Sequence, residues 1–143
     1  MQQKTPEQWI EQFTRYLIER RRLELRLPYT TIEIAIVNGI TIDGIGITCV
    51  NEGYGSSAGF TTIQGIRELP IQSPIEDIAL VQRIRDFASY LMRGQEVRIE
   101  TRDEVIERAQ ITQVQIGAAA VTDMTTDEEK GIIFKDLRSV RAI

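Results

Sequence analysis

The sequence of 143 residues contains no histidine, one cysteine and only three lysines. Without histidine, the chain lacks the commonest general base and the commonest metal ligand. A nucleophile would depend for its activation on a carboxylate or on a perturbed lysine, and the lysines are Lys4, Lys130 and Lys135. We therefore expect a protein that is not an enzyme and that uses no cofactor and no metal ion.

The sequence also disfavours disulfides, membrane helices and strong binding to polyanions. The single cysteine, Cys49, excludes a disulfide within the chain, and its alternation with Ile45 and Ile47 indicates a buried thiol. No apolar run approaches the roughly 18 residues of a membrane helix, and the first residues do not form a signal peptide, so we expect a cytoplasmic protein without membrane contact. The net charge of −4 argues against non-specific polyanion binding but leaves a local basic patch open.

The residues that are present indicate a mainly β protein. Apolar residues make up 42% of the chain and charged residues 27%, which is typical of a globular protein with one ordinary domain or two very small ones. Residues 32–50 place Asn38-Gly39 between two runs rich in isoleucine and threonine. This pattern predicts a hairpin with a type I′ turn, positive φ at both turn residues and strands of about six and ten residues.

The second strand of this hairpin is expected to bend. Its apolar positions change from even numbers, at Ile40 and Ile42, to odd numbers, at Ile45 and Ile47. A period-2 pattern that slips by one residue indicates a β-bulge or a sharp bend, and Gly44 lies at the slip. A strand that bends at a glycine and serves two faces is typical of a small, strongly twisted barrel.

Two helices are expected, each opened by a capping box. Thr5-Pro6-Glu7-Gln8 begins the first, which should reach about Arg21, and Ser73-Pro74-Ile75-Glu76 begins the second, with Gly94 as its C′ residue. Further strands are expected at residues 23–27, 60–69, 97–101, 104–116, 118–122, 131–134 and 137–143. We expect an irregular, mobile loop at residues 51–59, a linker at residues 70–74 and a solvated hairpin tip at residues 127–129.

The two halves of the chain resemble each other. At one constant shift along the chain, Ile10, Phe13, Tyr16 and Leu17 match Ile84, Phe87, Tyr90 and Leu91. At a second, smaller shift, residues 42–50 match residues 106–114, and at a third, Ile66 matches Leu137. We therefore expect two tandem modules, residues 1–70 and 71–143, each made of a helix and a small barrel.

Residues 32–44 combine an apolar alternation with Val37-Asn38-Gly39-Ile40 and a further glycine, Gly44. This pattern resembles the start of the Sm-like fold, and most of all the Hfq-like branch of that family, whose members are bacterial RNA chaperones. The resemblance implies an N-terminal helix followed by a five-stranded, strongly bent barrel of SH3-like architecture. The short fifth strand would then be residues 66–69 in the first module and 137–140 in the second.

The residues with which that family binds RNA are not retained. The family's Asp-x-x-x-Asn pattern after the second strand is absent, and so is the Tyr-Lys-His turn that its Hfq-like members carry before the fifth strand. The first module has Ile63-Gln64-Gly65 near that turn. The second has Phe134-Lys135-Asp136, in which a carboxylate that repels phosphate replaces the histidine. The resemblance therefore supports the barrel more than it supports an RNA site.

Other candidate contacts are cationic or aromatic. The run Arg20-Arg21-Arg22 either complements the negative end of the first helix dipole or contacts nucleic acid or a partner. Because arginine beside an aromatic ring can hold a single strand, the candidate contact residues are Arg20, Arg21, Arg22, Arg26, Tyr54 and Lys135. Asp43 and Glu107, which match at the second shift, either face each other as an acid/base pair or lie solvated on the surface.

Two functions remain open beside an enzyme, for which the sequence offers little support. The first is a non-enzymatic Sm-like or SH3-like module that builds an oligomer or binds a protein partner through exposed strand edges. The alternative is binding of RNA or another single-stranded nucleic acid by the same fold, which the net charge does not favour. Because two small barrels leave edges open even if they pair partly within the chain, we expect a homo-oligomer, a dimer or trimer of two-module chains.

Overall fold

The computed structural model describes residues 4–71 and 73–143. The first half contains, in order, α1 (Pro6–Glu19), β1 (Arg21–Arg26), β2 (Thr31–Ile40), β3 (Gly44–Cys49), β4 (Tyr54–Gly59), the 3₁₀ turn η1 (Phe60–Thr62) and β5 (Gly65–Ile71). The second half contains α2 (Ile78–Arg93), β6 (Glu96–Thr101), β7 (Val105–Val114), β8 (Ala118–Asp123), β9 (Glu128–Ile133), the 3₁₀ turn η2 (Phe134–Asp136) and β10 (Leu137–Ala142). The protein is therefore α+β and mainly β, as the sequence indicates.

All strand pairs among the described residues are antiparallel. The first strand set follows the spatial order β5-β1-β2-β3-β4, and the second strand set follows the order β10-β6-β7-β8-β9. One residue pair, Ile40 in β2 opposite Val114 in β7, joins the two sets into a single sheet. Each strand in one set thus has the same neighbours as its counterpart in the other.

The shift that places Phe13 on Phe87 also relates corresponding positions in the strands of the two halves. The β1–β2 register breaks between Leu23 and Leu25, and the β6–β7 register breaks between Val97 and Ile99. The second shift expected from the sequence is wrong, because β3 has the sheet neighbours that correspond to those of β8 and not to those of β7. The third is wrong because the counterpart of Ile66, which pairs with Leu25, is Val140, which pairs with Ile99. Aliphatic residues recur in every strand, so shifted matches arise easily from sequence alone.

The predicted turn at Asn38-Gly39 is also wrong. Both residues lie inside β2, which has ten residues, and β3 has six. The chain reverses at residues 41–43 instead. There the Thr41 hydroxyl donates to Asp43 Oδ1 at 3.0 Å, and the Thr41 backbone N–H donates to the Gly44 carbonyl at 2.9 Å. This polar turn decides the register that the Asn-Gly pair was expected to decide.

Asn38 marks the bend of the hairpin rather than its tip. Val37 pairs with Ile47 and Gly39 pairs with Gly46, so Asn38 is the extra residue of a β-bulge. Its side-chain amide donates to a threonine hydroxyl on the adjacent β3 at 3.0 Å. The described glycines with positive φ do not include Gly39. The predicted bend is therefore present, but it lies on the first strand of the hairpin.

The segment predicted as an irregular loop contains a strand. β4 pairs with β3 over six residues, from Gly44 opposite Gly59 to Cys49 opposite Tyr54. A Cβ atom on Gly44 would lie 2.5 Å from the carbonyl oxygen of Ala58, so the glycine allows the two backbones to approach closely. The hydrogen bonds to β3 outweigh the low strand propensity of the glycines and serines.

Helix α1 begins as predicted. Gln8 N–H donates to the Thr5 hydroxyl at 3.2 Å, and Thr5 N–H donates to the Gln8 side chain at 2.9 Å, which completes the capping box. The helix ends at Glu19, where Arg20 adopts the left-handed conformation with φ of 51°. Gly94 ends α2 in the same way, with φ of 62°. The predicted role of this glycine at the end of the second helix is therefore confirmed.

Helix α2 begins later than the predicted N-cap, Ser73. Its N-cap is Asp77, whose carboxylate accepts a hydrogen bond from Leu80 N–H at 3.2 Å. Residues 73–76 run before the helix in non-helical conformation, and Ile75 N–H donates to the Ile18 carbonyl at 2.9 Å. This bond ties the connection between the halves to the end of α1.

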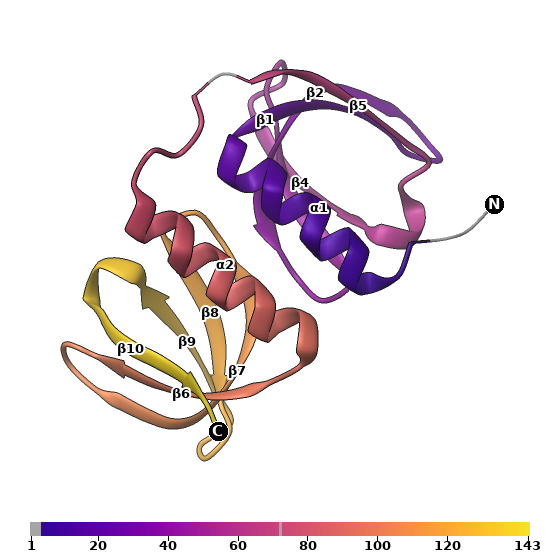
Figure 1. The fold of residues 1–143 in the computed structure, drawn as a ribbon. Coiled ribbons are helices and arrows are strands. Elements are labelled where there is room, and N and C mark those ends of the chain that lie inside the picture. The colour runs from indigo at the N-terminus through magenta and orange to yellow at the C-terminus, as the bar shows by residue number, and fades with distance from the viewer. Residues whose placement is uncertain (1–3, 72) are drawn as a thin grey trace.

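Each helix buries one face on its own strand set. The rings of Phe13 in α1 and Phe60 in η1 stack with centroids 6.0 Å apart, and Phe87 in α2 lies 5.0 Å from Phe134 in η2. The helices also pack against each other, and Figure 1 shows them side by side in opposite directions, between the two strand sets. Neither of the helices described has the length and apolarity that crossing a membrane would require.

Candidate functional site

Four strands have a hydrogen-bonded neighbour on one side only. Among the described residues, β4 pairs only with β3, β5 with β1, β9 with β8 and β10 with β6. Part of this pairing was expected to occur within the chain, but the two strand sets meet through β2 and β7 instead. Each of the four strands therefore presents a row of backbone N–H and C=O groups to which another strand can bind.

The edges of the first strand set carry little unneutralised charge. β4 contains no charged residue. On β5, Arg67 Nη2 lies 2.9 Å from Glu24 Oε2, and Glu68 Oε1 lies 2.8 Å from Arg15 Nη2. Desolvation acts to raise the pKa of Glu68, but hydrogen bonds to Tyr16 and Arg15 outweigh it and lower this pKa. Both charged residues of β5 are thus compensated within the chain.

The edges of the second strand set differ in charge. The exposed carboxylates of Glu128 and Glu129 lie on β9, and the exposed guanidinium groups of Arg138 and Arg141 lie on β10. None of these four side chains forms an ion pair with another residue that the structure describes. We call the first pair the acidic edge and the second pair the basic edge.

Lys130, the other charged residue of β9, is neutralised inside the second strand set. Its Nζ lies 3.3 Å from Glu104 Oε2 and 3.5 Å from Asp123 Oδ2. The hydrogen bond to Glu104 is the main reason that the pKa of Lys130 is raised. The backbone N–H of Thr125 is the main reason that the pKa of Asp123 is lowered. Lys130 therefore does not offset the charge of the acidic edge.

The two halves meet through corresponding parts of each half. Ile40 and Val114, which pair with each other, are equivalent positions under the shift that places Phe13 on Phe87. The packed helices α1 and α2 run in opposite directions (Figure 1). A contact that places the same surface of each partner opposite itself is isologous. This contact occupies the helices and the ends of β2 and β7, and it leaves the four edge strands outside.

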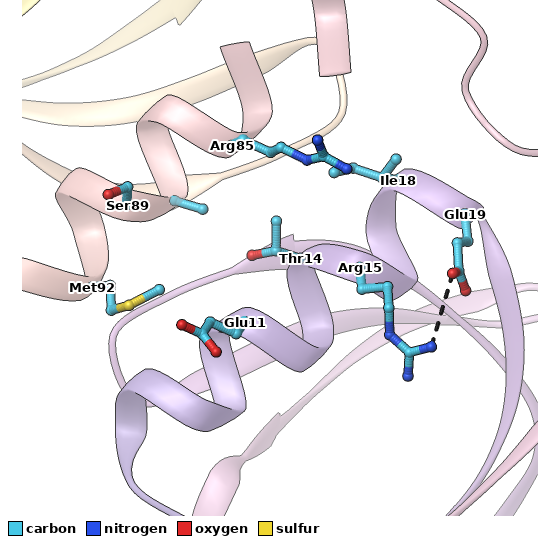
Figure 2. Close-up of a pocket in the computed structure, with 9 residues that line it drawn as sticks. Glu11, Thr14, Arg15, Ile18, Glu19, Arg85, Ser89 and Met92 are labelled. Atoms are coloured by element: carbon cyan, nitrogen blue, oxygen red, sulfur yellow. Dashed lines mark ion pairs between the residues drawn. The ribbon is translucent and has the colours of Figure 1, made fainter. Parts of the chain in front are cut away.

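A groove with a volume of about 480 Å³ lies between α1 and α2 (Figure 2). Glu11 and Met92 lie at one end of the groove, and Ile18 and Arg85 lie at the other. Glu11 and Arg85 are equivalent positions in the two helices, and because the helices run in opposite directions they lie at opposite ends of the groove. The described residues include no ion-pair partner for Arg85. The lining also includes Thr14, Ser89 and the ion pair of Arg15 with Glu19, so the groove is polar as well as apolar.

The predicted arginine run is divided between a helix end and a strand. Arg20 is the exposed C-cap of α1. Arg21 and Arg22 begin β1, and successive residues of a strand point to opposite faces. Arg21 donates to Glu19 and to the Leu69 carbonyl, each at 3.0 Å, whereas the Nε of Arg22 is buried without a partner among the described residues. The three guanidinium groups therefore do not point to one side.

The other candidate contacts are dispersed. Arg26 is exposed at the end of β1, opposite Gly65 in β5. Tyr54 is 56% exposed at the start of β4, and β2 and β3 separate that strand from β1 in the sheet. Lys135 is exposed in η2, in the second half of the chain. The structure gathers these residues into no single cluster.

Asp43 and Glu107 are not equivalent positions. Asp43 lies in the β2–β3 turn, where it accepts a hydrogen bond from Thr41. Glu107 lies in β7, where its Oε2 is 3.1 Å from Arg98 Nε. Because the two carboxylates lie in different strand sets and each is bonded elsewhere, they do not form the acid/base pair that the shifted repeat suggested.

Sequence reasoning did not identify the two charged edges. Residues 127–129 were predicted to be a hairpin tip, but only Asp127 lies in the turn, with φ of 62°, and the two glutamates begin β9. The sequence signal that could have revealed these edges is the change from acidic residues in this strand to Arg138 and Arg141 in the next strand. Only the strand order shows that these residues lie on opposite edges of one strand set.

A scan against protein-family models and a search of curated proteins found no match to this chain. Across residues 4–71 and 73–143, no group of three or more histidine, cysteine, aspartate or glutamate residues is placed to hold a metal ion.

Proposed function

We propose that the protein is a non-enzymatic module of two Sm-like units that assembles with further copies through its open strand edges. The units are residues 1–70 and 71–143. The order of elements supports this assignment, because in each half a helix precedes five antiparallel strands and a 3₁₀ turn precedes the fifth. The repeated register breaks after Leu23 and Val97 agree with the strongly bent strands that the resemblance implies.

The observation that carries the assembly proposal is that the outer side of each edge strand has no partner strand among the described residues. Native proteins normally protect such edges with charge, proline, bulges or a covering element, because an open edge recruits other strands. β4 has no charged residue, and its exposed positions are mostly glycine and serine. β5 has a proline, Pro70, but both of its charges are compensated. These edges are poorly protected against a partner, which favours pairing with another copy.

Hydrogen–deuterium exchange at two protein concentrations tests this proposal. Amides of β4, β5, β9 and β10 that point away from the chain should exchange more slowly at the higher concentration, because a neighbouring copy binds them. Amides of β2 and β3 serve as the internal control, because these strands are already paired on both sides. Exchange in the four edge strands that is independent of concentration would contradict the proposal.

Nucleic-acid binding stays a prediction with less support. The candidate residues lie on separate strands and in separate halves, and Glu24 lies between Arg22 and Arg26 on the same face of β1. Retention on immobilised single-stranded RNA that falls steeply with salt would favour this alternative, because phosphate contacts release counterions. The candidate cations do not lie together on one surface of the residues that the structure describes, so their positions do not favour nucleic-acid binding.

A further inference from the structure

We propose that the groove between α1 and α2 binds a short peptide with free ends, whose terminal ammonium lies against Glu11 and whose terminal carboxylate lies against Arg85. The groove is lined by residues of the two helices and by no residue of an edge strand, so this binding is separate from assembly. Three features of the groove support such a ligand: the correspondence of its walls, the two free charges at its ends, and its length.

The two walls of the groove are built from equivalent positions of the two helices. All lining residues except Glu19 form pairs under the shift that places Phe13 on Phe87: Glu11 with Arg85, Thr14 with Ala88, Arg15 with Ser89, and Ile18 with Met92. The walls therefore correspond in backbone position but differ in charge. A few charged or polar groups in a pocket fix the orientation of its ligand, so this difference selects one direction for an elongated molecule.

The charges at the two ends are free, whereas those between them are compensated. Arg15 Nη1 and Glu19 Oε2 lie 3.9 Å apart and form an ion pair within the groove (Figure 2). Glu11 and Arg85 are exposed, and neither forms an ion pair with another residue that the structure describes. A ligand with a cation at one end and a carboxylate at the other would compensate both, and a carboxylate can bind arginine through two parallel hydrogen bonds.

The distance between these two charges determines the length of the ligand. Glu11 lies beside Met92 at one end of the groove, and Arg85 lies beside Ile18 at the other (Figure 2). Ile18 follows Glu11 by about two helical turns, which corresponds to about 10 Å along the helix axis. An extended peptide spans about 3.3–3.6 Å per residue, so a peptide of about three residues reaches both charges. A single amino acid is too short to do so.

The middle of the groove suits the backbone of a peptide with small side chains. Thr14 and Ala88 line the groove and are both buried, so small side chains form its inner part. The Ser89 hydroxyl can donate to or accept from a peptide group. Ile18 and Met92 add apolar surface near the ends. The volume of about 480 Å³ lies within the range of about 300–1,000 Å³ that is typical of small-ligand sites.

Calorimetric titration of the full chain with trialanine tests the proposal. Trialanine with free ends should bind. N-acetyl-trialanine lacks the terminal ammonium, and trialanine amide lacks the terminal carboxylate. Each should bind about fivefold or more weakly than trialanine, because each loses one hydrogen-bonded contact with a charged group.

Matched variants assign each end of the peptide to one residue. Glu11→Gln should bind trialanine and N-acetyl-trialanine with equal affinity, and Arg85→Gln should bind trialanine and trialanine amide with equal affinity. The double variant E11R/R85E keeps the net charge and exchanges the two ends. Because the two positions are equivalent in antiparallel helices, this variant should again bind trialanine more tightly than either blocked peptide, with the peptide in the opposite direction.

Two control variants separate the groove from the general charge of the helices. Glu7→Gln and Arg83→Gln make the same changes in net charge as Glu11→Gln and Arg85→Gln, on the same helices, but neither residue lines the groove. Both controls should bind the three peptides as the unmodified chain does. Circular dichroism of every variant verifies that it is folded.

The titrations can contradict the proposal in three ways. Absence of trialanine binding at millimolar concentration would overturn it. A preference for free ends that persists in Glu11→Gln and Arg85→Gln would show that the peptide does not lie between these two residues. Binding of 8-aminooctanoate, an aliphatic chain with the same two end charges, as tightly as trialanine would overturn a peptide as the ligand.

Discussion

Arg20 and Gly94 occupy equivalent positions at the ends of the two helices, yet one is an arginine and the other a glycine. Both adopt the left-handed conformation, with φ of 51° and 62°. The cap N–H of each donates to a backbone carbonyl in the last turn. Glycine takes this conformation without the clash that a Cβ atom causes, so the same cap is strained in α1 and relaxed in α2.

The variant Arg20→Gly should therefore stabilise the protein by about 1 kcal/mol, and Gly94→Ala should destabilise it by a similar amount. The Arg20 side chain is exposed, so little packing is lost in the first variant. Chemical denaturation measures both changes in the free energy of unfolding. Equal effects of the same sign would show that the cap conformation does not determine these energies.

Gly44 and Gly39 differ in what an added methyl group would meet. At Gly44 the Cβ atom would lie 2.5 Å from the backbone carbonyl oxygen of Ala58, and at Gly39 it would lie 2.6 Å from the side-chain Nε2 of Gln113. A side-chain end can rotate away, whereas a paired strand cannot. We predict that Gly44→Ala costs about 1–3 kcal/mol and that Gly39→Ala costs clearly less.

Thermal denaturation of both variants checks this pair. The Asn-Gly turn that the sequence suggested would make Gly39 the more sensitive position, because positive φ would be required there. The observed bulge makes Gly44 the more sensitive position. A larger loss at Gly39 would contradict the register of the β2–β3 hairpin.

At the scale of elements, sequence patterns located both helices and most strands. The capping box at Thr5 and the glycine at position 94 depend on local hydrogen bonds and on local backbone conformation, so the sequence is sufficient to identify them. β4 and the β2–β3 turn could not be located in this way. Their positions depend on pairing with β3, and the competing local signals at Asn38-Gly39 and at residues 51–59 were stronger.

The start of α2 shows how two local signals compete. Ser73 and Asp77 are both good N-cap residues, and Ser73 has the proline and glutamate that typically follow. The chain uses Asp77, while Ile75 is bonded to the end of α1. Asp77→Ala should lower the free energy of unfolding by about 1 kcal/mol, and Ser73→Ala should leave it unchanged. Urea denaturation of both variants tests this order, and the reverse result would place the helix start at Ser73.

At the scale of the whole molecule, the sequence suggested two similar halves, but two of the three shifts that it suggested between them do not agree with the strand pairing. The match of Phe13 to Phe87 gave the shift at which the strand pairings of the two halves also correspond, because helices bury large residues at regular spacing. The strands carry similar aliphatic residues at many positions, so other shifts matched as well. Only the strand order shows how the halves correspond and that the second strand set carries opposite charges on its two edges.

This arrangement determines which strand edges a single chain leaves without a hydrogen-bonded neighbour. The contact between the halves uses α1, α2 and the pair Ile40–Val114, and it involves none of the edge strands. Two small strand sets that shared their edges would need no partner. Two sets that are joined through their helices retain four open edges among the described strands, and the proposed assembly follows from this difference.

The mass of the particle in solution tests the central claim most directly. Light scattering coupled to gel filtration, over a range of protein concentrations in low salt, should give a mass at least twice the 16.3 kDa of one chain, with a decrease on dilution or in high salt. A mass of 16.3 kDa at every concentration would show that the open edges do not recruit other copies, and it would contradict the proposed function.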